Sequence, residues 1–402
     1  MNRPAHIIAL AWAAVMIAIV SSSLTLAFTS REDGQRHWVS PEEYALIQRY
    51  ERLDEVRNTL MTRYYQPLQE DQLITGAIRG MTSAVGDVYT LYYTPEEMAL
   101  ENANEEGRYP GIGVLVERNR NGMIEVVRVY SGGPAEAAGL RPGDVIVSVN
   151  GQAVDGLTAA HYRDGVALMR GELDSEVALD IRRDDALMSF TVRRSDVNIS
   201  YVDYSMLEGD IGYVAVSQFT GDAADRFTDA LQYFKDNGAT GMVIDLRNNP
   251  GGFLHYVIRI ADAILPEGVI VYTEDREGER VYHRSDADFY DIPLTVLVNG
   301  MSASSSEILA ASVQALNRGK VVGVTTYGKG VVQTLTQFKE DGAGLQYTTS
   351  CYFDANGRSI NGVGVVPDLE VPLDDRFAPY HPDPVSDSQL AAALRILRAE
   401  GN

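Results

Sequence analysis

Ser304 and Lys329 are two residues whose side chains and settings could perform acyl-transfer chemistry. Ser304 lies in the segment Asn-Gly-Met-Ser-Ala-Ser-Ser-Ser-Glu (299–307), where small residues allow a sharp turn from a strand into a helix. Lys329 lies between Gly328 and Gly330 in a turn that follows the next predicted strand. Burial lowers the pKa of a lysine, and a neutral lysine can accept the hydroxyl proton of a serine. The pair therefore predicts a nucleophile and a base that need no histidine.

The negatively charged intermediate of acyl transfer requires backbone N–H donors, and the sequence offers two places for them. Ser305 begins the predicted helix, and N–H groups in the first turn of a helix have no partner within it. Residues 245–252 (Asp-Leu-Arg-Asn-Asn-Pro-Gly-Gly) end a buried strand in a turn whose glycines let N–H groups approach a ligand. Two such donors would form an oxyanion hole.

Each of these segments also fits a role without catalysis. The serines could simply cap a helix, Lys329 could be an exposed turn lysine, and Pro-Gly-Gly is a common turn. Residues 323–330 nearly match a phosphate-binding loop, but Gly330 stands where that loop needs a serine or threonine for magnesium. The catalytic interpretation therefore depends on the three segments together.

The composition argues against several other classes of function. The chain has 402 residues and a formal net charge of −22, whereas a nucleic-acid partner requires clustered lysine and arginine. Cys351 is the only cysteine, so we expect no internal disulfide and no cysteine-based metal site. None of the six histidines has the spacing of metal ligands on a helix or hairpin. We therefore expect no metal and no cofactor.

The N-terminus predicts a membrane segment. Residues 7–28 carry no charge, and a stretch of this length can span a bilayer as a helix. The positive charge of Arg3 lies on its N-terminal side, so residues 1–30 would form a single-pass anchor with the catalytic part outside the cytoplasm. Residues 25–27 (Thr-Leu-Ala) also fit a signal-peptidase site, and cleavage there would release the protein.

Hydrophobic periodicity and turn signals divide the rest of the chain into regions of different character. A capping box at residues 40–43 opens a helical pattern, and short strands alternate with turns from residue 108 onward. From residue 211, buried strands alternate with amphipathic helices, which predicts an α/β layered core. The predicted regions are a helical region (31–107), a strand-rich module (108–195), the α/β core (196–372) and a tail that ends in a helix (373–402).

Together these segments resemble the carboxyl-terminal processing peptidases, the S41 family of serine proteases. The resemblance rests on residues 245–252, 302–308, 327–333 and 357–368, and it extends upstream through 76–81 and 89–95. It implies an α/β protease core with the layered strands and helices of crotonase-like and ClpP-like proteins.

The resemblance also implies a role for individual residues. Ser304 would be the nucleophile, Lys329 the base, and Gln333 the residue that orients the lysine. On a fully extended strand Gln333 would lie roughly 13 Å from Lys329, so a hydrogen bond between them requires a bend at Gly330. The oxyanion donors would be the N–H groups of Gly252 and Ser305. Ser305 stands where the family more often has alanine, a difference that leaves the backbone donor in place.

The strand-rich module resembles a PDZ domain, the substrate-binding insert of this family. Gly111, Ile112, Gly113 and Val114 match the loop whose N–H groups receive the carboxylate of a peptide C-terminus. The peptide then adds to the sheet as a strand, and an apolar pocket receives its last side chain. Arg170 occupies a position that could couple peptide binding to the protease, although a surface arginine at a helix end is an equally good interpretation.

The resemblance thus implies a membrane-anchored serine endopeptidase that binds the apolar C-terminus of a protein and cuts its backbone upstream. Relatives form dimers through their terminal helices, so we also expect a homodimer. Two other functions remain open. The chain could be a silent scaffold in which only the PDZ module works, or a crotonase-type acyl-CoA enzyme, whose substrate an exported chain would not meet.

Overall fold

The computed structural model describes residues 40–105, 108–119, 121–130, 132–154, 159–198, 200–373 and 382–400. The chain divides into two compact units, Met1–Gly76 and Ala77–Asn402. The predicted anchor at residues 1–30 lies outside the described residues. In the ranges that are described, no helix is both long and apolar enough to cross a membrane.

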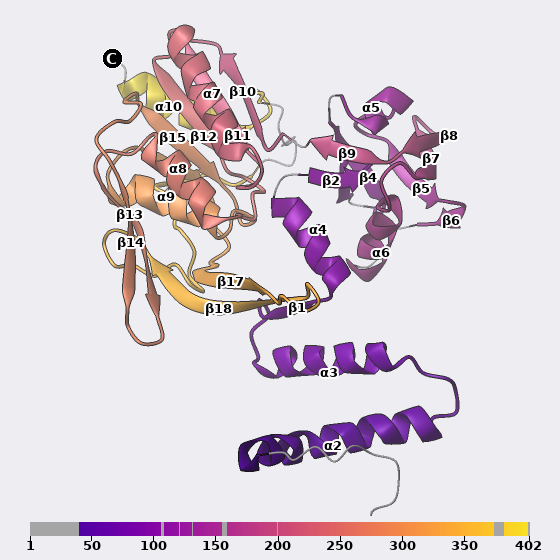
Figure 1. Ribbon diagram of the computed structural model, residues 1–402. Coiled ribbons are helices and arrows are strands. Elements are labelled where there is room, and N and C mark those ends of the chain that lie inside the picture. Colours follow the sequence, from indigo (N-terminus) through magenta and orange to yellow (C-terminus); the bar gives the residue numbers. More distant parts are fainter. Residues whose placement is uncertain are drawn as a thin grey trace, which may run out of the picture. The chain divides into compact units, whose positions relative to one another are not determined.

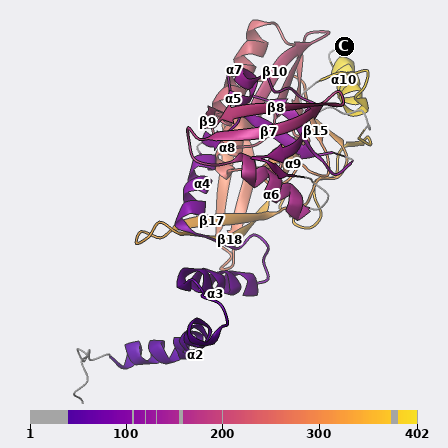
Figure 2. The same ribbon diagram turned by 90° about the vertical axis from the view of Figure 1, so that its right-hand side faces the viewer.

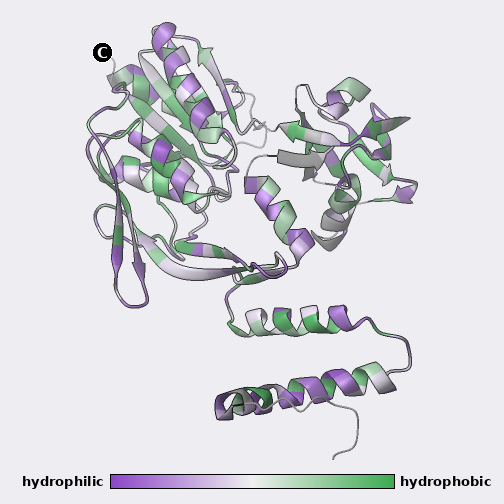
Figure 3. Cartoon of the chain, in the orientation of Figure 1, coloured by the Kyte–Doolittle hydropathy of each residue, from purple (hydrophilic) through white to green (hydrophobic). Residues whose placement is uncertain are grey.

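Helices form the described part of the first unit. Helix α2 (Pro41–Arg63) begins directly after Ser40, where the capping box at residues 40–43 predicts the start of a helix, and α3 (Glu70–Ala84) continues into the second unit. Polar and apolar residues are interspersed along α2 (Figure 3), and many of its large apolar side chains are exposed, among them Tyr44, Leu53 and Leu60. The exposed apolar side chains leave α2 with surface that could be buried against a partner.

Among the described residues of the second unit, a six-stranded sheet forms the centre, in the order β10-β11-β12-β15-β16-β19. Neighbouring strands from β11 to β19 run parallel, and β10 runs antiparallel to β11. The strands are β10 (Val202–Leu207), β11 (Ile211–Val216), β12 (Gly241–Asp245), β15 (Leu294–Val298), β16 (Lys320–Gly323) and β19 (Leu369–Glu370).

Helices cover both faces of this sheet (Figure 1). Successive side chains of a strand point to opposite faces, so each face has its own apolar residues for the helices to bury. Val214 and Ile244 pack with residues of α7, α8 and α9 on one face. Tyr213 and Val243 pack with α10 on the other. These two buried faces confirm the predicted α/β layered core. The helices are α7 (Ala223–Asp236), α8 (Leu254–Asp262), α9 (Ser305–Ala315) and α10 (Ser388–Glu400).

A second sheet lies beside the first and has the order β1-β18-β13-β14, with β17 also paired to β18. Strands β17 and β18 run side by side as a long hairpin (Figure 2), and their register shifts between Val332 and Gln333. The short strand β1 pairs with β18 although the two lie far apart in the sequence. The strands are β1 (Leu91–Tyr93), β13 (Gly268–Asp275), β14 (Arg280–Ser285), β17 (Val331–Gln337) and β18 (Gly344–Phe353).

The strand-rich module has its own sheet and its own core. Its main sheet has the order β3-β4-β5-β7-β8, with β6 paired to β5, so β3 lies at an edge. Asn150 and Gly151 form the turn between β5 and β6, and both have the positive φ that such a hairpin turn requires. The elements are β3 (Val114–Arg118), β4 (Ile124–Val129), α5 (Pro134–Ala138), β5 (Val145–Val149), β6 (Gln152–Ala153), α6 (Ala159–Met169), β7 (Glu176–Arg183) and β8 (Ala186–Arg193).

Three more elements connect this module with the rest of the second unit. Helix α4 (Pro95–Glu105) precedes β2 (Arg108–Gly111), which pairs with β9 (Ser195–Asn198). The chain therefore enters and leaves the module through adjacent antiparallel strands, as expected for a domain inserted between β1 and the core sheet.

Candidate active site

The turn that carries Ser304 connects β15 to α9. Ser304 has φ 55° and ψ −114°, a conformation that is costly for a non-glycine residue and that clusters at functional sites. Ser302 holds the turn, because its hydroxyl donates to Leu246 O at 2.8 Å and accepts from Asn299 N at 2.9 Å. The predicted sharp turn from strand to helix is thus present, and Ser304 stands directly before the helix.

Gly251 and Gly252 pack against this turn at positions where a side chain would collide. A Cβ on Gly251 would lie 2.7 Å from Ser304 Cβ, and one on Gly252 would lie 2.2 Å from Phe219 O. The hydroxyl of Ser305 donates to Gly252 O at 2.9 Å and so joins the two segments. Within the described residues, neither Gly252 N–H nor Ser305 N–H donates a hydrogen bond, so both can serve an oxyanion.

Lys329 is half-buried in a turn where the backbone segments approach closely. A Cβ on Gly330 would lie 2.4 Å from Asn361 N, and Gly328 has φ 92°. The Nζ of Lys329 lies 4.4 Å from the centroid of the Tyr89 ring, within the range of a cation–π contact. The described residues include no hydrogen bond between the Ser304 hydroxyl and the Lys329 amine. In this structure the amine rests on an aromatic face.

A buried carboxylate, that of Glu307, ties the two turns together. Its Oε2 accepts hydrogen bonds from Ser304 N and Lys329 N, each at 2.8 Å. Its Oε1 accepts from the Thr326 hydroxyl at 2.5 Å and from Gly328 N at 2.6 Å. Glu307 has no exposed surface, and a carboxylate removed from water requires partners of this kind. Glu307 therefore fixes the nucleophile turn relative to the base turn.

Tyr352 of β18 makes a second link between the same turns. Its hydroxyl lies 3.1 Å from Ser304 O and also contacts Lys329 O. Burial raises the pKa of Tyr352 well above its ordinary value, so the hydroxyl stays protonated and can donate. Tyr352 thus bonds to the carbonyl groups of Ser304 and Lys329, whereas Glu307 bonds to their N–H groups.

Gln333 lies beyond the register shift of β17, where the alternation of a regular strand is interrupted. Its side-chain N–H donates to Thr348 Oγ1 at 3.3 Å, and the Thr348 hydroxyl donates to Asp87 Oδ2 at 2.6 Å. Gln333 and Lys329 line the same pocket, but no hydrogen bond joins them among the described residues. Both side chains thus reach one pocket, but the irregularity of the strand lies between Val332 and Gln333, and Gln333 bonds to Thr348.

One pocket of about 260 Å³ collects these groups: Ser304, Lys329, Gln333, Gly252 and Ser305 all line it. Its remaining wall is largely apolar, and Glu101 of α4 adds a carboxylate. The apolar side chains are Phe253, Leu254, Ile308, Val331, Val332 and Leu335. The pocket therefore combines a hydroxyl, an amine and two free N–H groups with an apolar surface that could receive a side chain.

Two opposing effects act on the pKa of Lys329. Burial lowers the pKa of its ammonium below the ordinary lysine value, whereas the negative charges of Asp87 and Glu307 oppose that change. A lowered pKa increases the fraction of lysine able to accept a proton near neutral pH.

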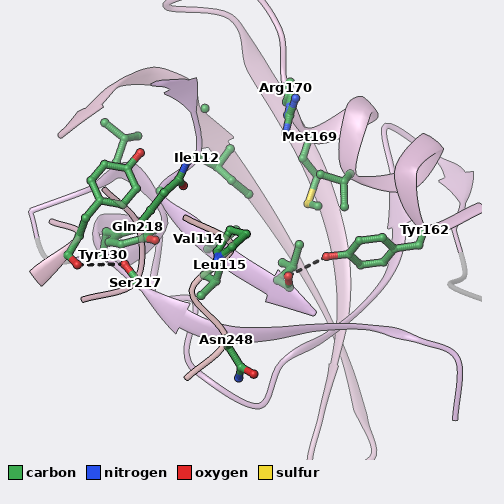
Figure 4. A pocket seen from close by; sticks show the side chains of 17 residues that line it. Ile112, Val114, Leu115, Tyr130, Tyr162, Met169, Arg170, Ser217, Gln218 and Asn248 are labelled. Atoms are coloured by element: carbon green, nitrogen blue, oxygen red, sulfur yellow. Dashed lines mark hydrogen bonds between the residues drawn. The ribbon is translucent and has the colours of Figure 1, made fainter. Parts of the chain in front are cut away.

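A second pocket, of about 410 Å³, runs along the strand-rich module (Figure 4). Ile112 and Val114 line it together with Met169 of α6. The Tyr162 hydroxyl donates to Val116 O at 2.7 Å, which joins α6 to the edge strand β3. Gly111, Gly113 and Arg170 also line this pocket, so all five residues predicted for peptide binding and coupling meet in one place.

Two residues line both pockets. Gln218 follows β11, and Pro250 precedes the glycines of the candidate oxyanion hole. A chain bound in the second pocket could therefore pass these residues and continue into the pocket that contains Ser304.

Four residues at the site were missed by the sequence reasoning. Glu307 could have been found, because a glutamate three positions after an N-cap serine is a capping-box signal. Tyr352, Asp87 and Tyr89 carried no such signal, since strand pairing in the folded chain brings them to Lys329.

Comparisons with known proteins agree with this architecture. Residues 210–371 match the model of peptidase family S41, residues 125–183 match a PDZ domain, and residues 15–97 match the N-terminal domain of the activating protease CtpB. The chain thus combines a peptidase core with a PDZ domain.

Similar proteins identify the class. The chain is 30% identical over 366 residues to the carboxy-terminal processing protease CtpA of Bacillus subtilis, covering 90% of this chain and 76% of that protein. It is 32% identical over 324 residues to a probable CtpA-like serine protease of Staphylococcus aureus, covering 80% of this chain but only 64% of that one.

A solved structure, the photosystem II D1 C-terminal processing protease, matches with a TM-score of 0.53 and 27% identity, covering 90% of this chain and 98% of that one. These findings define a serine-type peptidase of the carboxy-terminal processing class. The chain belongs to the S41 family.

Proposed function

We propose that this peptidase hydrolyses peptide bonds with Ser304 as nucleophile and Lys329 as base, in proteins whose apolar C-termini bind its PDZ domain. The observation that carries the proposal is the shared acceptor Glu307 Oε2, which holds the N–H groups of Ser304 and Lys329 in one pocket. A capping box alone would explain the bond from Ser304 N. It would not explain the bonds from Lys329 N, Gly328 N and the Thr326 hydroxyl, which bring the base turn to the same carboxylate.

The reaction follows from the groups in the pocket. Neutral Lys329 accepts the hydroxyl proton of Ser304 while Oγ attacks the scissile carbonyl carbon. The N–H groups of Gly252 and Ser305 stabilise the oxyanion that forms. The Lys329 ammonium then donates its proton to the departing amine, which leaves an acyl-enzyme. A water molecule repeats the sequence, releases the acid product and restores the serine.

In this proposal Gln333 orients the lysine once substrate is bound. Both side chains line the pocket, and the bond from Gln333 to Thr348 is long at 3.3 Å, so it could be exchanged for one to Lys329.

The PDZ domain selects the substrate in this account. The free C-terminal carboxylate would bind at residues 111–114, and its last side chain would enter the apolar surface that includes Val166 and Met169. Arg170, at the end of α6 in the same pocket, would couple occupancy of the PDZ domain to the protease.

We further propose that residues 1–30 anchor the chain in the cell membrane with the catalytic part outside the cytoplasm, or that cleavage there releases it. We also propose a homodimer. The exposed apolar side chains of α2 support this assembly, because a partner would remove them from water.

The test uses residues 31–402 and an unstructured protein that ends either in apolar or in charged residues. Mass spectrometry identifies the fragments made by the wild type, Ser304→Ala and Lys329→Ala. Cleavage that is lost in both variants and faster for the apolar tail supports the proposal. Cleavage that survives in either variant contradicts it. Tail binding without cleavage in the wild type would favour the scaffold function.

A further inference from the structure

A short segment before β1 reaches the candidate base. Asp87 accepts hydrogen bonds from Tyr89 N at 3.0 Å and from the Thr90 hydroxyl at 2.7 Å, which closes the segment into a tight turn. Two contacts with β18 fix its place: Thr348 donates to Asp87 at 2.6 Å, and Gln346 donates to Tyr89 O at 3.0 Å. The segment is therefore anchored independently of Lys329.

This anchored turn places an aromatic face against Lys329 and a carboxylate close enough for its charge to act on the amine. The Tyr89 ring lies 4.4 Å from Nζ. The amine donates no hydrogen bond within the described part of the chain, so the ring is its main partner there. Burial raises the pKa of Tyr89, which keeps the ring neutral, and a neutral ring attracts a cation through its face.

The charge of Asp87 acts in the same direction. Burial by itself would raise the pKa of Asp87, but hydrogen bonds from Thr348, Tyr89 N and Thr90, with the charge of Lys329, lower it overall. Asp87 is therefore ionised at neutral pH, and its negative charge favours the ammonium form of Lys329.

Other titratable groups also lie near Lys329, and each makes contacts of its own. Glu307 of α9 is occupied by four hydrogen bonds from the two turns. Tyr352 of β18 contacts the backbone oxygen of Lys329, and Tyr327 of the same turn contributes to the raised pKa of Tyr89. Glu101 of α4 lines the pocket but is not among the charges that act on Lys329.

We propose that Asp87 and Tyr89 are positioning residues that hold the Lys329 ammonium after it has taken the proton of Ser304. The arrangement parallels the carboxylate that orients histidine and stabilises its cation in other serine proteases. The inference rests on the proposed roles of Ser304 and Lys329. It adds that the base is completed by a segment matching the N-terminal domain model, residues 15–97, and not by the peptidase core alone.

The proton balance of the step is simple. The proton leaves Ser304 Oγ as the C–O bond forms, resides on Lys329 Nζ during the tetrahedral intermediate, and passes to the leaving amine as the C–N bond breaks. The Tyr89 ring and the Asp87 carboxylate exchange no proton. They lower the free energy of the ammonium while it exists.

Removal of either group should therefore shift the titration of Lys329 to lower pH. Asp87→Asn keeps the size of the side chain but removes a negative charge, and we expect a shift on the order of one pH unit. Tyr89→Leu removes the ring and should lower kcat/KM about three- to thirtyfold at its alkaline maximum. Tyr89→Phe keeps the ring and should behave much like the wild type.

The direct measurement is an NMR titration of isotope-labelled lysine Cε in the Ser304→Ala background. The chain contains only four lysines, and Lys235, Lys320 and Lys339 are exposed whereas Lys329 is half-buried. The signal of Lys329 is identified as the one that is missing from a Lys329→Met sample. We expect Lys329 to titrate below the other three, and lower still with Asp87→Asn or Tyr89→Leu. Glu101→Gln should leave the titration of Lys329 unchanged.

The pH dependence of kcat/KM in the same variants with Ser304 intact gives a second readout. The alkaline rise of kcat/KM should move to lower pH in Asp87→Asn and in Tyr89→Leu. In Tyr89→Phe it should lie at the pH of the wild type. Thermal unfolding shows whether each variant is folded. If Asp87→Asn does not fold, the comparison of Tyr89→Leu with Tyr89→Phe still tests the proposal.

The outcomes separate the two proposals. An active Lys329→Ala would overturn the proposed function and this inference with it. An inactive Lys329→Ala, with Asp87→Asn and Tyr89→Leu leaving both the titration and the rate profile unmoved, would overturn this inference alone.

Discussion

Ser304 and Lys329 share one hydrogen-bond acceptor, because Oε2 of Glu307 receives the backbone N–H of each at 2.8 Å. The relative position of the two turns is thus set by backbone contacts to one buried carboxylate. The flexible lysine side chain then has only to move within the pocket. Such support from outside the reacting pair is what holds catalytic groups in a productive arrangement.

Glu307→Gln should weaken this arrangement strongly. The amide can supply only one acceptor oxygen, so at least one of four donors loses its partner in a buried site. We expect a loss of about 1–3 kcal/mol in the free energy of unfolding and of about 100-fold in kcat/KM. Urea unfolding and cleavage kinetics measure both. The exposed Glu340→Gln is the control, and equal behaviour of the two variants would contradict this role for Glu307.

Gly252→Ala should remove activity without removing peptide binding. Its φ of 145° is unsuited to other residues, and the added Cβ would lie 2.2 Å from Phe219 O, so the loop must move and carry its N–H away from the oxyanion. We expect kcat/KM to fall about 100-fold or more.

The matched control for Gly252 is Gly300→Ala, whose Cβ would meet only Thr325 O at 4.0 Å. Kinetics of cleavage and binding of a labelled C-terminal peptide should separate the two variants. Retention of full activity by Gly252→Ala would exclude this N–H as an oxyanion donor.

Arg247→Met should destabilise the core, because Arg247 joins the end of β12 to the segment before α10. Its guanidinium is buried and bonds to Asp245 at 2.5 Å and to Asp387 at 2.8 Å. Removal leaves two buried carboxylates without their positive partner, although Tyr213 and Leu390 N still donate to them, at a cost of about 3–5 kcal/mol.

The exposed pair of Arg259 and Asp225 provides the comparison for Arg247. Arg259→Met should change stability by less than about 1 kcal/mol. Chemical unfolding of both variants checks the difference, and an Arg247→Met variant as stable as the wild type would show that the network contributes nothing.

Val166→Glu should weaken the binding of apolar tails. Val166 is half-buried in the PDZ pocket, and a carboxylate there would repel the C-terminal carboxylate and favour water over an apolar side chain. We expect affinity for an apolar C-terminal peptide to fall about tenfold or more. Leu187→Glu, at an exposed position of the same domain, should leave it unchanged in a fluorescence binding assay.

The sequence predicted the parts of the site that depend on local chain geometry. The turn of Ser304 and the glycine-flanked turn of Lys329 are readable because small residues and glycines fix backbone conformation locally. Strands such as β11 and β15 also follow from their uninterrupted apolar runs, which buried parallel strands require.

What the sequence could not predict depends on contacts between distant segments. Asp87 and Tyr89 reach Lys329 only because β1 pairs with β18, and no periodicity in either segment reports that pairing. The register shift at Gln333 likewise arises in the folded hairpin, so a regular strand was the natural expectation. The location of the anchor at residues 1–30 and the domain boundaries stay predictions.

The central claim, that Lys329 activates Ser304, is tested most directly by the rate at which a fluorophosphonate labels the protein. This reagent phosphonylates an activated serine and releases fluoride, without needing a bound C-terminal tail. We predict one label, on Ser304, with a rate that rises with pH as Lys329 loses its proton and that collapses in Lys329→Ala. Labelling of another residue, or equally fast labelling of Ser304 in Lys329→Ala across the pH range, would contradict the account.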